Sequence, residues 1–302
     1  MTLRIGARSS ALSLAQVELV ARALREVAET VVITFRTTGD RLSSLGAAIS
    51  AKGVFTKEID EALLDGRVDL GVHSLKDLPS EMPEGLVIAA VPTREDPRDV
   101  LLSRSGHGLA LLPPGARIGT GSPRRRAQLL AARPDCPVSE ARGNVDTRIR
   151  RLREGRWDAI VLARAGLARL GRLNEITEVL NPERMLPAVG QGALALVARA
   201  DDGPTRRLVE RLEDGAARCE AEAERGLLRR LEAGCRAPMA GLARAAGESL
   251  ALRARVFSPN GERMLEASAD GSTDQPEEVA SRVAEDLLRR GAGLLIGEAR
   301  AE

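Results

Sequence analysis

The sequence predicts an α/β fold in which two hinged lobes are followed by a smaller α+β domain with an antiparallel sheet. Three observations support this prediction. Strand-like and helix-like patterns alternate as far as residue 198, two segments look like crossings between lobes, and the pattern changes near Gly215. Alternating strands and helices are typical of α/β folds with a largely parallel sheet. Two lobes joined by two crossings predict a ligand cleft between them.

The first lobe is predicted from residues 1–92 together with 193–210. The segment Ala11–Glu29 contains neither Gly nor Pro and carries apolar residues at helical spacing, so we expect a helix there. A second helix is expected over Phe55–Leu64. The expected strands of this lobe are Leu3–Ala7, Val31–Arg36, Val68–His73, Leu86–Val91 and Ala193–Ala198.

The second lobe is predicted from residues 98–186, between crossings at 92–97 and Leu186–Gly192. Its expected elements, in order, are a strand over Ala116–Gly119, a helix over Pro123–Ala132, a strand over Val138–Ala141, a helix over Val145–Glu154 and a strand over Ala159–Ala163. The third domain, residues 215–302, begins with a charged helical stretch. Strands over Met239–Ala245, Ser249–Ser258 and Met264–Ala269 follow, and a helix over Pro276–Arg290 closes it.

Composition narrows the classes of function. Of 302 residues, 43% are hydrophobic, and 45 basic residues balance 43 acidic ones. This balance and the near absence of aromatic residues argue against a nucleic-acid-binding protein. No apolar run reaches the roughly 18 residues that span a bilayer, and a strand-like pattern begins at Leu3, which leaves no room for a targeting segment. We therefore expect a cytoplasmic protein that binds no membrane.

The three cysteines, Cys136, Cys219 and Cys235, lack metal-type spacing, and their odd number suits a reducing compartment. No metal site is predicted. Cys235 differs from the others because it lies in a loop bounded by Gly234 and Pro238 beside Arg236, which favours a thiolate. Buried cysteines usually act as small hydrophobic residues, and we interpret Cys136 and Cys219 in this way.

Two strand-to-helix turns in the second lobe have the character of anion sites. The first is Gly119-Thr120-Gly121-Ser122-Pro123-Arg124-Arg125, and the second is Arg142-Gly143-Asn144-Val145-Asp146-Thr147-Arg148. Free backbone N–H groups, hydroxyls and guanidinium groups meet where anions bind well. One such turn alone, in a chain with 42 arginines, is better explained as an ordinary capped helix with solvated arginines, but two of them on one lobe favour a ligand with several carboxylates or phosphates. We expect Leu at Arg124 or Arg142 to impair ligand binding with little change in stability.

The first lobe offers a third turn of this kind and a candidate acid. Arg8-Ser9-Ser10 follows the first strand, and a plain helix cap with Ser10 explains it equally well. His73-Ser74-Leu75-Lys76-Asp77-Leu78-Pro79 follows a buried strand, at the end where open α/β sheets bind ligands. Asp77 in that position could stabilise a developing cation or exchange a proton.

Together these motifs resemble the porphobilinogen deaminase family. The resemblance rests on the Arg8 turn, Lys52-Gly53-Val54-Phe55, the His73–Pro79 segment, both anion turns, Leu186–Gly192 and Gly234-Cys235, in the family's order and over essentially the whole chain. It implies two hinged lobes of the periplasmic-binding-protein type (type II). It also implies a dipyrromethane cofactor held by a thioether to Cys235.

The resemblance further implies an enzyme of tetrapyrrole biosynthesis. Four porphobilinogen molecules are joined head to tail with loss of ammonia, and the linear tetrapyrrole is released by hydrolysis. Asp77 is the implied catalytic residue. The implied cofactor-binding residues are Cys235, Lys76, Ser122, Arg124, Arg125, Arg148, Gly143, Ser74 and Thr120. The implied substrate-binding residues are Arg8, Ser10, Gln16, Arg142, Lys52, Phe55 and Gln191. We expect a monomer.

The chain departs from the family pattern at Ser50-Ala51, Gly121, Val197 and Ala141, none of which is the acid or the cysteine. Among other classes, a solute-binding protein that clamps a polyanion would explain the hinge and the arginines. It would leave Cys235 and the third domain without a role. A nucleic-acid-binding protein remains a more distant alternative.

Overall fold

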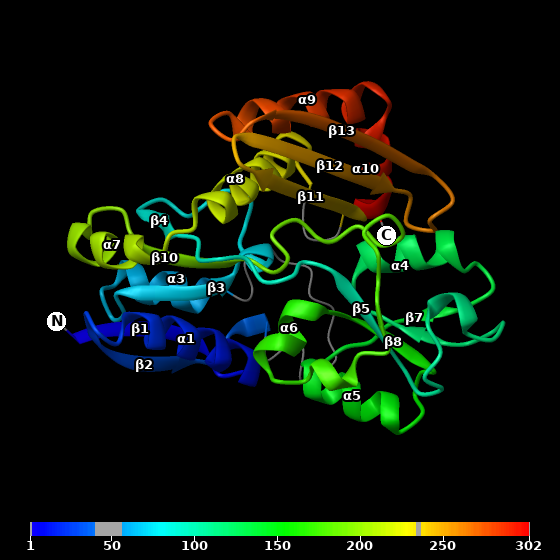
Figure 1. Cartoon of the computed structure of the whole chain (residues 1–302), viewed down its shortest axis with the longest axis horizontal. Coiled ribbons are helices and arrows are strands. Elements are labelled where there is room, and N and C mark those ends of the chain that lie inside the picture. Colours follow the sequence, from blue (N-terminus) through cyan, green and yellow to red (C-terminus); the bar gives the residue numbers. More distant parts are fainter. Residues whose placement is uncertain (1, 40–55, 234–236, 302) are drawn as a thin grey trace.

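The computed structural model describes residues 2–39, 56–233 and 237–301. Figure 1 shows three parts: a lobe coloured mostly blue to cyan, which also contains the yellow-green segment of residues 194–209, a lobe coloured green, and a C-terminal part coloured yellow to red that lies against both. Each part is built on one sheet, two with five strands and one with three. The predicted fold class is confirmed.

The first sheet has the order β2-β1-β3-β10-β4 and carries helices on both faces. Helices α1 and α7 pack on one face and α3 on the other, each against its own apolar cluster. The elements of this lobe are β1 (Thr2–Arg8), α1 (Ala11–Leu24), β2 (Glu29–Phe35), α3 (Lys57–Leu64), β3 (Leu70–Ser74), β4 (Leu86–Ala90), β10 (Leu194–Arg199) and α7 (Gly203–Val209).

Two predictions for this lobe were wrong in part. Helix α1 ends at Leu24, because the chain must turn before Glu29, which already pairs with Thr2 in the sheet. The sheet is also less parallel than predicted, since β10 runs antiparallel to β3 and β4. Strand β10 enters from the second crossing, at the end where β3 leaves the sheet, and Leu194 therefore pairs with Ser74.

The second sheet repeats this plan with the order β7-β6-β8-β5-β9. Strand β5 runs antiparallel to β8 and β9 because it enters from the first crossing. Neither β5 nor β9 was predicted from the sequence. The elements are β5 (Asp99–Ser103), β6 (Ile118–Gly119), α4 (Pro123–Ala132), β7 (Val138–Ser139), α5 (Val145–Arg153), β8 (Ala159–Ala163), α6 (Arg164–Arg169) and β9 (Glu178–Val179).

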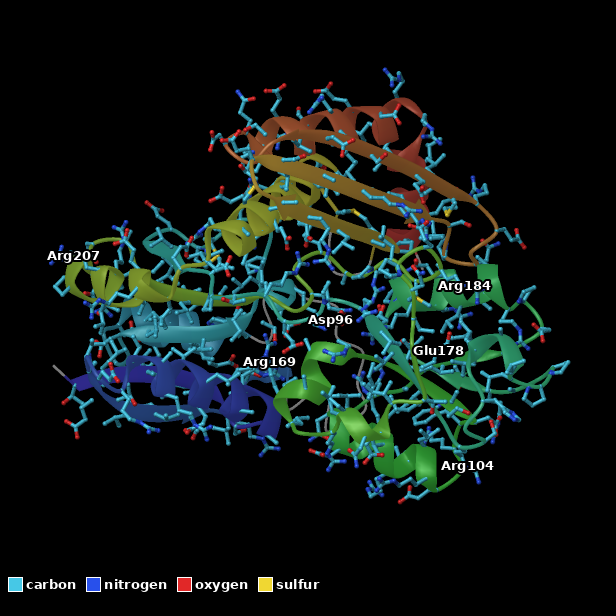
Figure 2. All side chains as sticks on the ribbon, in the orientation of Figure 1. Asp96, Arg104, Arg169, Glu178, Arg184 and Arg207 are labelled. Atoms are coloured by element: carbon cyan, nitrogen blue, oxygen red, sulfur yellow. The ribbon has the colours of Figure 1, made fainter. Side chains whose placement is uncertain are left out.

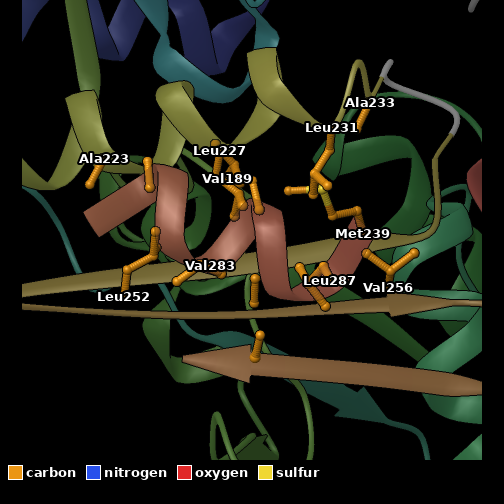
Figure 3. Packing of buried hydrophobic residues seen from close by; sticks show 14 of the residues in the cluster. Val189, Ala223, Leu227, Leu231, Ala233, Met239, Leu252, Val256, Val283 and Leu287 are labelled. Atoms are coloured by element: carbon orange, nitrogen blue, oxygen red, sulfur yellow. The ribbon is translucent and has the colours of Figure 1, made fainter. Parts of the chain in front are cut away.

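The C-terminal sheet is antiparallel, in the order β11-β12-β13, as predicted. Figure 3 shows helices α8 and α9 packed over the same side of it, with Leu227, Leu231, Val283 and Leu287 meeting Leu252 and Val256. The elements are α8 (Gly215–Arg230), β11 (Met239–Ala246), β12 (Ser249–Phe257), β13 (Met264–Ser272), α9 (Pro276–Arg289) and α10 (Ala292–Ala301). Four 3-10 helices complete the described chain: η1 (Leu75–Asp77), η2 (Leu109–Leu111), η3 (Leu173–Glu175) and η4 (Glu210–Leu212).

The two crossings lie side by side. The Nε of Arg94 donates to the carbonyl of Gln191 at 2.9 Å, and the N–H of Glu95 donates to the carbonyl of Gly192 at 3.3 Å. Gly192 has φ +91°, and a Cβ there would lie 2.1 Å from the Glu95 carbonyl oxygen. Only glycine allows this approach.

A buried ion cluster ties both crossings to the C-terminal part. Arg94 donates to Glu220 and Glu224, both at 2.8 Å. Glu224 also accepts from the N–H of Gly190 and, at 2.8 Å, from that of Ala243 in β11. The hinge of the two lobes is therefore anchored on the third part. Of the helices in the described ranges, none is long and apolar enough to cross a bilayer.

Candidate functional site

Asp77 lies at the carboxyl end of β3, in η1. The buried side chains of Leu75 and Leu78 pack into the core on either side of it, and the N–H of Leu78 closes the turn on the Leu75 carbonyl at 3.2 Å. The half-buried carboxylate of Asp77 accepts no hydrogen bond from any residue that the structure describes. It is therefore fixed in place and open to a ligand.

The pocket beside Asp77 gathers side chains from separate motifs of the first lobe. It is lined by Arg8, Ser10, Gln16 and Ser74 as well as Asp77. The Nε2 of Gln16, which is buried, donates to Ser74 Oγ at 2.7 Å. Ser10 caps α1, with its Oγ accepting from the N–H of Ser13. The structure thus brings four of the predicted residues together around the predicted acid.

In the second lobe, both predicted turns cap helices as expected. Ser122 Oγ accepts from the N–H of Arg125 at the start of α4, and Thr120 Oγ1 accepts from the N–H of Ser122 at 3.2 Å. Arg148 donates from Nε to the Gly143 carbonyl at 2.7 Å. Burial and the charge of Arg125 lower the pKa of Arg148 to about 10. The two turns therefore bring positive charges close enough to repel one another.

A second cluster lies where the lobes meet. Arg124 and Arg125, at the start of α4, are 4% and 6% exposed and both donate to Asp99, which is fully buried. Gln191 joins this cluster to Lys76, whose Nζ donates to Gln191 Oε1 at 3.3 Å. The second crossing also passes close to the backbone of this residue: a Cβ on Gly190, at φ +72°, would lie 2.9 Å from the backbone nitrogen of Lys76.

Arg124 has a larger structural role than the sequence suggests, because its guanidinium bonds to buried groups of the protein. Its Nη1 donates to Asp99 at 2.7 Å and to the Leu186 carbonyl at 2.6 Å. The expectation that Leu at this position leaves stability almost unchanged does not agree with this environment, because the replacement leaves Asp99 short of a buried partner. Direct contact of Arg124 with a ligand stays a prediction.

We expect Arg124→Leu to lower the free energy of unfolding by about 3–5 kcal/mol, the usual cost of removing one partner of a buried ion pair. Urea denaturation measures this change. Arg126→Leu is the matched control, since Arg126 is an exposed residue of the same helix that donates to the Val138 carbonyl. It should cost about 1 kcal/mol. Equal losses in the two variants would contradict this reading of Arg124.

Among the described residues, Arg142 and Gln191 have their own hydrogen-bond partners inside the protein. The Nε of Arg142 donates to Glu140 at 2.5 Å, with its side chain 28% exposed. The amide of Gln191 is 1% exposed and fully used inside the protein, which does not favour the predicted contact with substrate. Lys52, Phe55 and Cys235 lie outside the described residues.

Sequence reasoning missed charged residues between the lobes. Figure 2 shows Asp96 and Arg169 near the centre of the molecule, between the blue-to-cyan lobe and the green one. Arg169 donates to the Gly192 carbonyl at 2.6 Å, and burial lowers its pKa. Asp96 pairs with Arg98 at 2.6 Å. In a chain with 42 arginines no sequence signal separates Arg169 from its neighbours.

The charges of the site are unbalanced. Four neighbouring cations (Lys76, Arg124, Arg125 and Arg148) face two carboxylates, Asp77 and Asp99, among the described residues. Burial, with the repulsion of Arg125 and Arg124, lowers the pKa of Lys76 to about 8 although both carboxylates raise it. A ligand with several carboxylates would restore the balance.

Comparison with known proteins agrees with this chemistry. Residues 3–207 match the family model "Porphobilinogen deaminase, dipyromethane cofactor binding domain", and residues 218–289 match "Porphobilinogen deaminase, C-terminal domain". A porphobilinogen deaminase of Rubrobacter xylanophilus is 49% identical over 298 residues, which are 98% of this chain and 97% of that protein. One of Syntrophobacter fumaroxidans is 45% identical over 300 residues, with the same coverage.

Solved structures resemble the chain more distantly. A putative methionine-binding lipoprotein of Bacillus subtilis has a TM-score of 0.45 at 14% identity, over 70% of this chain and 89% of that one. The VFT2 domain of BvgS from Bordetella pertussis has a TM-score of 0.43 at 15% identity, over 70% and 86%. With both domain models and near-complete relatives matched, the chain belongs to the porphobilinogen deaminase family.

Proposed function

We propose that this protein is a transferase of tetrapyrrole, porphyrin and heme biosynthesis. It joins four porphobilinogen units with loss of ammonia and releases the linear tetrapyrrole hydroxymethylbilane by hydrolysis. The observation that carries the proposal is the position of Asp77. Its carboxylate has no hydrogen-bond partner among the described residues, is held by a buried turn, and lies beside a group of cations that exceeds the described counter-charges.

The domain division follows the sheets. We propose a first lobe of residues 1–92 with 193–210, a second lobe of residues 98–186, and a C-terminal domain of residues 215–302. Each range supplies the strands of one sheet. The membership of β10 in the first sheet supports the return of the chain to the first lobe.

The cation cluster suits the dipyrromethane cofactor. Each pyrrole brings an acetate and a propionate, so a dipyrromethane carries four carboxylates to a site with an excess of positive charge. When bound, it supplies a covalent anchor on Cys235 and the free pyrrole carbon from which the chain grows. We assign its carboxylates to Lys76, Arg125 and Arg148, with hydroxyls from Ser74, Thr120 and Ser122. We also assign to this cofactor site the N–H of Gly143 and the buried guanidinium of Arg124, which pairs with Asp99.

We assign the incoming porphobilinogen to the pocket of the first lobe. Arg8 and Ser10 bind its carboxylates there, and Gln16 orients the Ser74 hydroxyl. Arg142, Lys52 and Phe55 complete this group from the other motifs of the family. Asp77 holds the pyrrole N–H, stabilises the positive charge that develops on it and exchanges its proton.

We also propose that the protein works as a cytoplasmic monomer without nucleic-acid partners. Cys136 and Cys219 are free buried thiols, which suits a reducing compartment. The near balance of basic and acidic residues gives no general attraction to nucleic acid.

Intact-mass measurement of the purified protein with porphobilinogen tests the function. We expect a two-pyrrole adduct on the protein, together with consumption of porphobilinogen and a linear tetrapyrrole product. The competing solute-binding protein would bind porphobilinogen reversibly, without adduct or turnover. That outcome would overturn the proposal.

A further inference from the structure

We propose that Asp99 is a positioning residue that fixes the guanidinium groups of Arg124 and Arg125 and, through Gln191, the ammonium group of Lys76. The inference rests on the proposed function, because Arg125 and Lys76 are there assigned to the cofactor. Asp99 itself belongs to none of the motifs on which the family resemblance rests.

The contacts of Asp99 occupy both of its oxygens. Oδ2 accepts from Arg124 Nη1 at 2.7 Å. Oδ1 accepts from Arg125 Nε at 3.0 Å, from Arg125 Nη2 at 2.7 Å and from Gln191 Nε2 at 2.9 Å. Two guanidinium groups from one turn of α4 are thus oriented by one carboxylate. An Asp at this depth keeps its charge because the arginines hold its pKa below the ordinary value, although burial alone would raise it.

Gln191 extends this arrangement to the first lobe. Its Nε2 also donates to the Pro97 carbonyl at 2.6 Å, which joins the second crossing to the first. Its Oε1 accepts from Lys76 Nζ at 3.3 Å and from Arg125 Nη2 at 3.4 Å. The amide orientation is set by these partners, since an inverted amide would place N–H groups against two cations. Gln191 therefore links cations of both lobes to the same acid.

The cluster sits on the hinge itself. Asp99 begins β5 directly after the first crossing, and Gln191 belongs to the second crossing. In a rotation of one lobe against the other, atoms near the hinge move least. Cations held there keep their spacing while the more distant parts of the cleft move. The cluster thus fixes where the carboxylates of the cofactor bind.

The negative charge of Asp99 also raises the pKa of Lys76. The charged groups facing this ammonium are Asp77 and Asp99, which raise its pKa, and Arg124 and Arg125, which lower it. Burial is the largest contribution and lowers the pKa to about 8. Without the charge of Asp99 the pKa would fall further. Lys76 would then lose its proton, and its hold on a carboxylate, at a lower pH.

The test compares Asp99→Asn with a matched control, Asp69→Asn. Asp69 is also a buried acid between two arginines, with Arg4 at 2.6 Å and Arg199 at 3.7 Å, but it lies away from the hinge. The full-length chain is freed of cofactor and incubated with porphobilinogen from pH 6.5 to 9.5. Intact mass then gives the fraction that carries the two-pyrrole adduct, and circular dichroism gives the melting temperature.

Both variants should melt at lower temperature than the parent protein. Only Asp99→Asn should load roughly tenfold less adduct at pH 7, the loss expected when a charged hydrogen-bonding partner is removed. The alkaline fall of loading should move about half a pH unit to one unit lower in this variant. In Asp69→Asn, the alkaline fall of adduct loading should stay at the pH of the parent protein.

Parental loading and a parental alkaline fall in folded Asp99→Asn would overturn the inference. The proposed function would stand in that case, because the parent protein would still load and turn over. If the parent itself forms no adduct, the function fails first. If Asp99→Asn does not fold, Gln191→Met decides, since it cuts the link to Lys76 but keeps the Asp99 ion pairs. Parental loading of folded Gln191→Met would then overturn the part of the inference that links Asp99 to Lys76.

Discussion

Replacing Cys235 by Ser is expected to yield protein without any covalent cofactor, whereas Cys136→Ser and Cys219→Ser are expected to retain it. A thioether forms from a thiolate, so the attachment site must be a cysteine that ionises and can be reached. Cys235 lies outside the described residues, and its assignment rests on the resemblance of Gly234-Cys235 to the family.

The other two cysteines are poorly suited to attachment. Cys136 is fully buried, and burial raises its pKa. Cys219 is 6% exposed and donates from Sγ to the Thr273 carbonyl at 3.2 Å. Burial, with the nearby charges of Glu222 and Glu220, raises its pKa to about 11. Both thiols therefore stay protonated at neutral pH.

Intact mass of each variant, purified and incubated with porphobilinogen, measures the result. A denaturing step before the measurement removes any pyrroles that are bound without a covalent bond. The cysteine assignment would be wrong if an adduct persisted on Cys235→Ser, or if either of the other variants lost it while remaining folded by circular dichroism.

Much of the fold could be predicted because its signals are local. Helix α4 begins and ends where predicted, since Ser122 caps it and Pro123 suits its first turn. Strand β8 also has the predicted bounds, as an apolar run between charged segments. Strand β5 was missed, because the apolar stretch Val100–Leu102 is short and follows a charged residue. Its place in the sheet depends on pairing with β8 and β9, which no local pattern reveals.

The site, too, has one part that the sequence predicts and one part that it does not. Asp77 and the arginine-bearing turns follow strands, so the topology of the sheet alone predicts that they meet near the cleft. The cluster around Asp99 could not be predicted, because its members come from four separate parts of the chain: Lys76, Asp99, the start of α4 and Gln191. Burial also decides which arginines are structural. Arg124 and Arg126 are two residues apart, yet one is buried and the other exposed.

Asp77→Asn should fold and bind porphobilinogen but turn it over about two to three orders of magnitude more slowly, which is the usual loss when one electrostatic stabiliser is removed. Loss of ammonia and attack by the next pyrrole both place positive charge on a pyrrole N–H. The Asp77 carboxylate can accept that N–H and stabilise the charge. Asparagine keeps the shape but lacks the charge. Its NH₂ group is a hydrogen-bond donor, so it cannot accept from the pyrrole N–H.

Asp77→Glu should retain part of the activity, because the charge remains but the longer side chain displaces it from its place between Leu75 and Leu78. Asp65→Asn is the control: Asp65 is an exposed acid of the same lobe, paired with Arg67 at 3.2 Å, and its loss should leave turnover at the parental rate. Porphobilinogen consumption is measured on protein whose adduct has been verified by intact mass, which separates turnover from cofactor assembly. Near-parental turnover by adduct-bearing Asp77→Asn would remove Asp77 from the mechanism, since a neutral amide cannot stabilise the cation that both steps create.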